Sequence, residues 1–213
     1  MKPFIAVVDY EMGNLHSVSK AVEKAGGSVQ VTNSASMIRR AHGVVLPGVG
    51  AFGQAVTNLS ARKLLAPLIE VLEKNKPFLG ICLGLQLLFE RSEESPGSKG
   101  IGLFKGSVHR FRIPASSALK VPHMGWNTIV RKPSSAAKPL RGIKDGSYFY
   151  FVHSFFPVPQ DSSIVATHTP YPQPFCSSVA KDHLFASQFH PEKSGDMGHK
   201  LLKNFVQEVA ACS

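Results

Sequence analysis

The chain has 213 residues, of which 43% are hydrophobic, enough to build the core of one large domain. No apolar run approaches the roughly 20 residues that a membrane-spanning helix needs, which argues against a membrane protein. The first residues lead directly into a strand-like segment, so we expect no signal or transit peptide. Three cysteines, at positions 82, 176 and 212, form neither a disulfide framework nor a zinc-binding spacing, which favours a reducing compartment, the cytoplasm.

The charge is strongly positive and unevenly distributed. The formal net charge is +10, and the segment Ser95–Lys144 contains many lysines and arginines but no aspartate or glutamate. A nucleic-acid-binding face is one interpretation, although no nucleic-acid-binding motif accompanies it. We favour a solvated surface or a patch that steers an acidic partner protein.

The first half of the chain alternates apolar, strand-like runs with segments of helical periodicity. We expect strands at Phe4–Tyr10, Ser28–Thr32, Gly43–Leu46 and Phe78–Ile81. We expect helices at Leu15–Ala25, at Ala51–Lys74, where Pro67 could interrupt the helix, and at Leu83–Phe89. This order predicts an α/β fold with a doubly wound parallel sheet.

The second half of the chain is richer in short β-like pieces separated by Gly, Pro and Ser. We expect these pieces at Leu103–Ile113, Val121–Val130, Tyr148–Phe156, Ile164–His168, Phe175–Ala180 and Leu184–Phe189. The stretches Pro114–Ala118 and Pro133–Pro139 predict exposed loops, and Met197–Val209 predicts a final amphipathic helix. Because there is no internal repeat and no long linker, we expect residues 1–213 to form a single domain.

The sequence GICLG around Cys82 predicts a nucleophile elbow, G-x-S-x-G with sulfur in place of oxygen. Gly80 and Gly84 remove the side chains that would clash in such a turn, and the following helix amino terminus favours a thiolate. Gln86 lies one turn further on and could touch whatever Cys82 attacks. A lone cysteine more commonly packs as a small buried hydrophobe, but the two flanking glycines argue against that here.

A second group of polar residues ends the last predicted strand, in the sequence SQFHPEKS. His190 and Glu192 are two residues apart, so in an extended segment, which Pro191 favours, they point to the same side. A carboxylate in this position can orient an imidazole and stabilise its protonated form. A surface histidine beside a salt-bridging glutamate is the usual interpretation, but the cysteine elbow favours a Cys-His-Glu triad.

The loop Pro47–Gly50 follows the strand that we expect beside the strand of Cys82. Its backbone N–H groups could face the same crevice and, with the N–H of Leu83, hold a developing oxyanion. Taken alone, the loop is more simply interpreted as a plain strand-to-helix turn.

Six segments together resemble a known family. GICLGLQ, QFHPEKS and PGVGAF are similar to the motifs of the class I, triad-type glutamine amidotransferases. DYEMGNLHSV, VPHMGWN and YFVHSF resemble, within that class, the glutaminase subunits of imidazole glycerol phosphate synthase. The resemblance implies a flavodoxin-like α/β fold and hydrolysis of glutamine to glutamate and ammonia. It also implies a (β/α)8 cyclase partner that uses the ammonia in histidine biosynthesis, with no cofactor and no metal.

The resemblance assigns roles to residues by their positions in the motifs. It implies that Cys82 is the nucleophile, His190 the base and then the acid, and Glu192 the residue that orients it. It implies oxyanion-binding N–H groups at Val49 and Leu83, glutamine contacts at Gly50, Gln86, Ser154 and Phe155, and cyclase contacts at Trp126, Asn127, Tyr150 and Lys193. The chain departs from the family pattern at Glu11 and Pro172, where glycine is usual or frequent.

Three other interpretations remain open at this point. An amidotransferase serving another acceptor, such as chorismate, lies in the same class, although VPHMGWN speaks against it. A catalytically silent, basic binding module would bind nucleic acid in a salt-sensitive way and would lack glutaminase activity. A free-standing cysteine hydrolase or peptidase would turn over peptides rather than glutamine.

Overall fold

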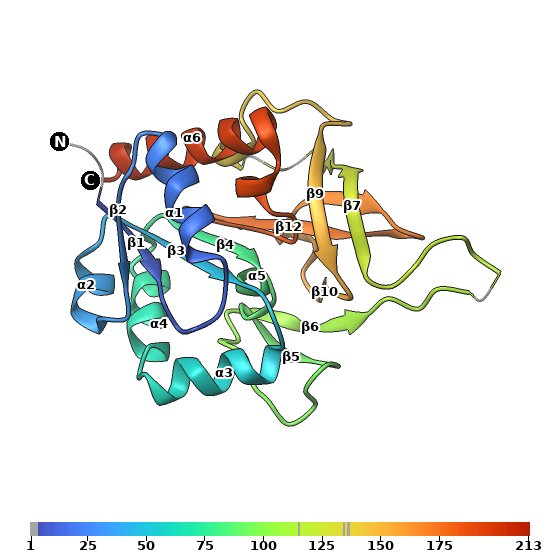
Figure 1. Cartoon of the computed structure of the whole chain (residues 1–213), viewed down its shortest axis with the longest axis horizontal. Coiled ribbons are helices and arrows are strands. Elements are labelled where there is room, and N and C mark those ends of the chain that lie inside the picture. Colours follow the sequence, from blue (N-terminus) through green and yellow to red (C-terminus); the bar gives the residue numbers. More distant parts are fainter. Residues whose placement is uncertain (1–3, 115, 134, 136) are drawn as a thin grey trace.

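A central eight-stranded sheet organises the molecule (Figure 1). The computed structural model describes residues 4–114, 116–133, 135 and 137–213. Five parallel strands lie in the order β2 (Ser28–Thr32), β1 (Phe4–Val8), β3 (Gly43–Gly48), β4 (Phe78–Cys82) and β13 (Leu184–Ser187). Antiparallel strands β12 (Pro174–Lys181), β11 (Val165–Pro170) and β8 (Val130–Arg131) extend this sheet. The parallel order is that of flavodoxin-like folds and confirms the predicted α/β class.

Helices cover both faces of the sheet. Helices α1 (Leu15–Lys24) and α6 (Gly195–Ala211) lie on one face, and α2 (Ala35–Arg40), α3 (Phe52–Ala61) and α4 (Leu65–Glu73) on the other (Figure 1). Alternate residues of β1 serve the two cores, since Ile5 and Val7 pack into one cluster and Ala6 and Val8 into the other. A buried parallel strand therefore needs apolar residues throughout, as β1 has.

The second half of the chain adds two small sheets beside the carboxyl ends of the parallel strands. One has the order β10 (Phe155–Pro159), β6 (Phe104–Arg110) and β5 (Phe89–Ser92). The other is an antiparallel ribbon of β7 (His123–Thr128) and β9 (Tyr148–His153). Short 3₁₀ turns lie at η1 (Lys138–Leu140), η2 (Ser162–Ile164) and η3 (Pro191–Lys193). The loop between β6 and β7 projects from the body of the molecule beside the ribbon (Figure 1).

Several predicted boundaries are wrong in detail. The helix expected at Ala51–Lys74 is two helices, separated around Lys63, whose φ is 56°, while Pro67 lies inside the first turn of α4. Proline is tolerated in a first turn because the N–H groups there have no intrahelical acceptor. The helix expected at Leu83–Phe89 is only α5 (Leu83–Gln86), and Phe89 begins strand β5.

Other differences arise from short elements with weak periodicity. The six-residue helix α2 has no counterpart among the predictions, and Tyr148–Phe156 is split between β9 and β10. The piece expected at Val121–Val130 is likewise divided between β7 and β8, and the final helix is longer than Met197–Val209 at both ends. In the two predicted loops, residues 115, 134 and 136 lie outside the described residues. Within the described part of the chain, no helix has the length and apolar character needed to cross a bilayer.

Candidate active site

Cys82 occupies a strained turn between β4 and α5. Its φ of 55° and ψ of −105° lie outside the regions that most residues adopt. A side chain at Gly84 would collide with the carbonyl oxygen of Leu46, and a Cβ at Gly80 would lie 3.0 Å from the carbonyl oxygen of Gly84. The two glycines are therefore needed for the close approach that the elbow motif predicts. Cys82 itself is buried, at 6% exposure, and occupies the N-cap position of the four-residue helix without a capping hydrogen bond from its side chain.

His190 and Glu192 face each other directly after β13. The Nδ1 atom of His190 lies 2.7 Å from Oε1 of Glu192, and both side chains are 2% exposed. The backbone differs from the expectation, because Pro191 begins a 3₁₀ turn rather than holding an extended segment. Proline suits a first helical position, since its φ is already helical and its missing N–H is not needed there. The side chains meet nonetheless, across this turn.

The environment of His190 favours its protonated form. Burial by itself lowers the pKa of His190, but the neighbouring Cys82 thiolate and the Glu192 carboxylate outweigh burial, so the pKa is raised. Nε2 of His190 and Oε2 of Glu192 are buried without a hydrogen-bond partner among the described residues. Nε2 is therefore available for a reacting group on the Cys82 side.

The loop Pro47–Gly50 lies next to Cys82 in the structure. Gly48 is the last residue of β3 and is paired with Cys82 in the sheet. The buried hydroxyl of Tyr10 donates a 2.8 Å hydrogen bond to the carbonyl of Pro47, which holds this end of the loop. Val49 is 40% exposed, and Gly50 has a φ of 104°. The backbone is therefore held at Pro47 and Gly48, and the loop becomes exposed from Val49 onward.

Gln86 is buried, and its carboxamide is joined to a neighbour of Cys82. Its Nε2 donates to the carbonyl of Phe155 at 3.1 Å and to Oε1 of Gln188 at 3.2 Å. Nε2 of Gln188 in turn lies 3.5 Å from the Cys82 sulfur. Sequence reasoning did not single out Gln188 or Tyr10, although each stands inside a quoted motif, in QFHPEKS and DYEMGNLHSV.

Of the four residues predicted to face a partner, the structure brings three together: Trp126 on β7, Tyr150 on β9 and Lys193 on η3. The Trp126 and Tyr150 rings meet edge to face at 6.2 Å, and Nζ of Lys193 lies 5.8 Å from the Tyr150 ring centroid. Trp126 is 56% exposed. Asn127 follows it on β7, so its side chain lies on the opposite face, where Nδ2 is 3.2 Å from Nε2 of the buried His123, and the structure does not bring it into this group. The carbonyl of Tyr150 accepts a 2.9 Å hydrogen bond from the N–H of His190, so this ribbon is joined directly to the candidate site.

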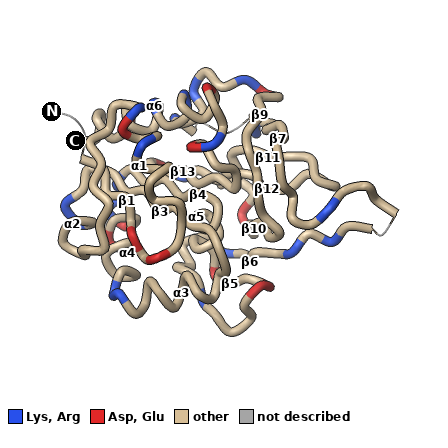
Figure 2. Tube along the Cα trace, in the orientation of Figure 1, with Lys and Arg blue, Asp and Glu red and all other residues tan. Residues whose placement is uncertain are grey.

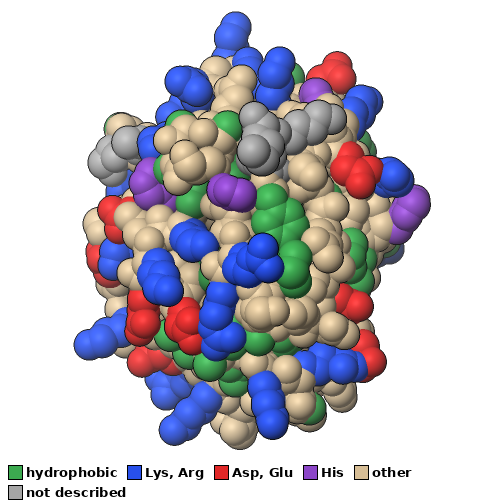
Figure 3. All heavy atoms as spheres, turned by 90° about the vertical axis from the view of Figure 1, so that its left-hand side faces the viewer, with side chains coloured by type: hydrophobic (Ala, Val, Ile, Leu, Met, Phe, Trp, Pro, Cys, Tyr) green, Lys and Arg blue, Asp and Glu red, His purple; other side chains and the backbone are tan. Residues whose placement is uncertain are grey.

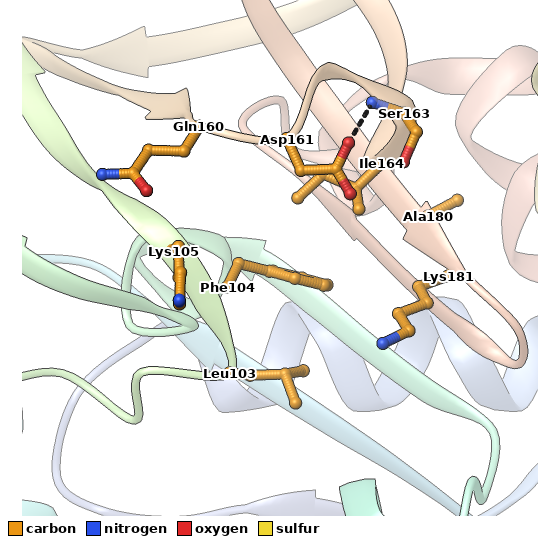
Figure 4. A pocket seen from close by; sticks show the side chains of 9 residues that line it. All are labelled: Leu103, Phe104, Lys105, Gln160, Asp161, Ser163, Ile164, Ala180 and Lys181. Atoms are coloured by element: carbon orange, nitrogen blue, oxygen red, sulfur yellow. Dashed lines mark hydrogen bonds between the residues drawn. The ribbon is translucent and has the colours of Figure 1, made fainter.

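One cavity lies apart from these residues, whereas Phe155 lines another, beside Glu93 and Phe111. A cavity of about 580 Å³ lies between β6, η2 and β12 and brings Lys105, Lys181 and Asp161 to its rim (Figure 4). The Asp161 carboxylate accepts from the N–H of Ser163 (Figure 4). None of the residues that line this cavity belongs to the predicted site.

Charged side chains are spread over several elements. Basic positions follow the β6–β7 loop (Figure 2), whereas the face seen in Figure 3 carries basic and acidic side chains side by side. Arg112 on that loop is 84% exposed and lies 3.3 Å from Glu93, so part of the basic segment is paired with an acidic residue outside it.

Comparison with known proteins agrees with this fold. A family model described as glutamine amidotransferase class-I matches residues 6–209, and the chain belongs to this family of enzymes. More particularly, it is 50% identical over 209 residues to the imidazole glycerol phosphate synthase subunit HisH of Moorella thermoacetica, an alignment covering 98% of this chain and 96% of the relative. The HisH subunit of Thermosynechococcus vestitus is 48% identical over 209 residues, covering 97% and 98%.

A solved structure supports the fold alone. The structure of PurLQS from Thermotoga maritima has a TM-score of 0.71 and 20% sequence identity to this chain, and the match covers 99% of each. The whole chain, including the small sheets of its second half, therefore follows an architecture seen in other proteins.

Proposed function

We propose that this chain is the glutaminase subunit of an imidazole glycerol phosphate synthase. In this role it hydrolyses glutamine to glutamate and ammonia, acting in the cytoplasm as a single domain of residues 1–213. The ammonia passes to a (β/α)8 cyclase, which makes imidazole glycerol phosphate and an aminoimidazole carboxamide ribotide for histidine biosynthesis. The identity of about half of all residues with HisH subunits over nearly their full length supports this assignment. The observation that supports the chemistry is the buried His190–Glu192 pair, 2.7 Å apart, with Cys82 near enough to help raise the pKa of His190.

The first half-reaction forms a thioester. His190 takes the proton of Cys82, and the thiolate attacks the side-chain amide carbon of glutamine. The N–H groups of Val49 and Leu83 hold the oxyanion that develops on the amide oxygen. The intermediate then collapses, the C–N bond breaks, and His190 returns its proton to the leaving nitrogen, which departs as ammonia.

The second half-reaction releases glutamate. His190, again neutral, removes a proton from water as it attacks the thioester carbonyl, and the proton then goes to the departing Cys82 sulfur. Glu192 holds Nδ1 of His190 at 2.7 Å, which keeps Nε2 facing the reacting atoms and stabilises the imidazolium in both steps. Gly50, Gln86, Ser154 and Phe155 line the glutamine side of the crevice in this proposal.

The partner docks on the β7–β9 ribbon. Trp126 and Tyr150 lie on its exposed side beside Lys193 of η3, and large exposed side chains flank them, Met124 at 67% and Tyr148 at 59%. Asn127 lies on the other face of β7, against His123. An aromatic, apolar patch with a polar rim is the usual composition of a protein-binding hot spot. The reaction needs neither a cofactor nor a metal, because the sulfur, the imidazole and the backbone N–H groups provide every step.

Labelling with a glutamine-analogue electrophile tests the assignment. We expect its mass on the one peptide that contains Cys82, and production of glutamate from glutamine that rises when the cyclase subunit is added. Cys176 is an internal control, because burial raises the pKa of its thiol to about 12. Cys212 is exposed and controls for nonspecific reactivity. Labelling confined to Cys176 or Cys212 would contradict the nucleophile assignment.

A further inference from the structure

Two buried histidines form a hydrogen-bonded pair behind the candidate site. Nδ1 of His123 lies 3.1 Å from Nε2 of His153. The other nitrogen of His123, Nε2, lies 3.2 Å from the Asn127 amide nitrogen. The other nitrogen of His153, Nδ1, lies 2.8 Å from the carbonyl oxygen of Phe155. The two side chains are 4% and 6% exposed, and the triad mechanism uses neither.

The groups at the two ends of the histidine pair, Asn127 and the Phe155 carbonyl, fix the direction of its hydrogen bonds. A carbonyl can only accept, so Nδ1 of His153 carries a hydrogen and donates to Phe155. In the neutral ring, Nε2 of His153 then accepts, so Nδ1 of His123 is the donor, and Nε2 of His123 accepts from Asn127. The Asn127 orientation is set independently, because its Nδ2 also donates to the carbonyl of Pro170 at 3.0 Å and its Oδ1 accepts from the N–H of Thr128 at 2.8 Å.

The surroundings keep both imidazoles neutral, as this direction requires. Tyr171 stacks on His123 with ring centroids 4.0 Å apart, and Phe111 and Phe175 each lie 5.2 Å from the His153 ring. Burial lowers the pKa of His123 to about 4. Burial also lowers the pKa of His153 to about 3, although its bond to the Phe155 carbonyl opposes this. A proton added to either ring would place two donors face to face.

A row of hydrogen bonds connects His153 to the neighbourhood of Cys82. The Phe155 carbonyl accepts from His153 and also from Nε2 of Gln86, at 3.1 Å. Nε2 of Gln86 also donates to Gln188, whose own amide nitrogen lies 3.5 Å from the Cys82 sulfur. These two acceptors fix which end of the Gln86 carboxamide is the amide nitrogen, and so leave Oε1 as the end it can present to a ligand.

We propose that His123 and His153 are positioning residues for glutamine binding. As a neutral pair with a fixed hydrogen-bond direction, they hold the Phe155 carbonyl, and this carbonyl orients Gln86 so that an acceptor oxygen faces the substrate. Substrates that present an N–H or ammonium donor at that point are favoured. The inference rests on the proposed glutaminase function and adds to it two residues outside the triad. Their contribution is to ground-state binding, which affects KM rather than kcat.

Two variants at one position test the proposal in the complex with the cyclase subunit. His153→Phe removes both hydrogen bonds but keeps an aromatic ring in the aromatic cluster. His153→Asn retains an amide N–H close to the place of Nδ1 and so keeps the bond to the Phe155 carbonyl. From glutamate production at varied glutamine, we expect His153→Phe to raise KM about tenfold, the effect of losing about one hydrogen bond, with kcat changed less than about threefold. We expect His153→Asn to restore KM to within about threefold of wild type.

Phe111→Leu is the control for simple loosening, since it disturbs packing in the same cluster without touching a hydrogen bond of the pair. Its KM should stay at the wild-type value. An unchanged KM in His153→Phe, or an equal rise in all three variants, overturns the inference alone. Should His153→Phe fail to fold, His123→Leu tests the inference at the other member of the pair. We expect a smaller rise in KM for His123→Leu, and an unchanged KM would contradict the inference. A wild-type complex that does not hydrolyse glutamine overturns the proposed function and the inference with it.

Discussion

At the scale of single residues, the positive φ angle of Cys82 differs in its setting from those of ordinary turns. Lys63, Asn75 and Asp182 have φ values of 56°, 52° and 52° and lie in turns that end helices or join strands. Cys82, with φ 55°, instead lies between a strand and a helix with glycines on both sides. The strain at Cys82 is compensated by the packing of the sheet around it, as is usual for residues held in sparsely populated conformations at functional sites.

Glu11 has a φ of 64° in the turn after β1, which explains why glycine is usual there in the family that the sequence resembles. Its side chain forms an exposed ion pair with Arg62, which contributes little. We expect Glu11→Gly to be more stable than Glu11→Ala by about 1 kcal/mol, because glycine adopts a left-handed conformation without a Cβ penalty. Urea unfolding of the two variants measures the difference, and both lack the ion pair. Equal stabilities would show that the turn is not strained.

The buried histidine pair predicts a specific dependence of stability on pH. Both pKa values are lowered in the folded state, so the unfolded chain binds more protons below its ordinary histidine pKa of about 6.5. The free energy of unfolding therefore falls as the pH falls, by roughly 2 kcal/mol for each imidazole between pH 6.5 and 5. The other titratable groups nearby are Tyr171, stacked on His123, and His190.

The double variant His123→Gln, His153→Asn removes both titrating rings. Its unfolding free energy should change less over this pH range than that of the wild type, as measured by urea unfolding at each pH. Parallel pH profiles for the two proteins would mean that other groups govern the acid sensitivity.

At the scale of elements, the sequence predicts secondary structure best where the local residue pattern and the tertiary packing favour the same conformation. The elbow at Gly80–Gly84 was predictable because a strand, a nucleophile and two glycines give one consistent signal. The 3₁₀ turn at Pro191 was not, because proline is compatible with both extended and first-turn backbone and the choice depends on tertiary contacts. The pairing of His123 with His153 was also hidden, since it depends on the register of β7 against β9, which the turn and the buried face set together.

The loop after β3 is the element where we expect activity to be controlled. Gly48 lies within β3 beside Cys82 and the Pro47 carbonyl is held by Tyr10, so the freedom to reorient a peptide is confined to Val49 and Gly50. We predict that the N–H of Val49 points away from Cys82 in the free subunit and toward it when the partner and acceptor are bound. Such a shift requires tighter binding to the second conformation.

Val49→Pro removes this N–H and should reduce kcat in the cyclase complex by about 10²–10³-fold, the usual effect of losing one oxyanion donor. Val49→Ala keeps the N–H and is the matched control. Alkylation of Cys82 by a small reagent should proceed at the same rate in both, because the thiol itself is unchanged. A Val49→Pro complex that is activated to the wild-type level would place the control elsewhere, most simply at His190.

At the scale of the whole molecule, the proposed function gives the two halves of the chain different tasks. The parallel sheet of the first half and β13 provide neighbouring strand ends, one at Cys82 and one leading to His190, and ligand sites of open α/β sheets lie at such ends. The small sheets of the second half carry Phe155 and the exposed ribbon with Trp126. In the proposed function, chemistry and docking are joined where the ribbon meets the segment after β13, at the hydrogen bond from the N–H of His190 to the carbonyl of Tyr150.

The basic charge lies where it can act on association with a partner. Arg112 and Lys120 are exposed on the β6–β7 loop, which projects beside the ribbon (Figures 1 and 2). Charges at the rim of an interface change the association rate and its salt dependence more than they change turnover. We therefore expect Arg112→Glu with Lys120→Glu to slow association with the cyclase at low salt, while kcat at saturating partner stays near wild type.

The matched control is Lys24→Glu with Arg40→Glu, the same charge change on α1 and α2, at the end of the molecule away from the ribbon (Figure 1). Stopped-flow association rates at about 10 mM and 150 mM salt provide the measurement, since the Debye length falls from about 30 Å to about 8 Å over this range. The loop variant should differ from the control at the lower salt and approach it at the higher. Equal slowing in both variants would mean that net charge matters and the position of the loop does not.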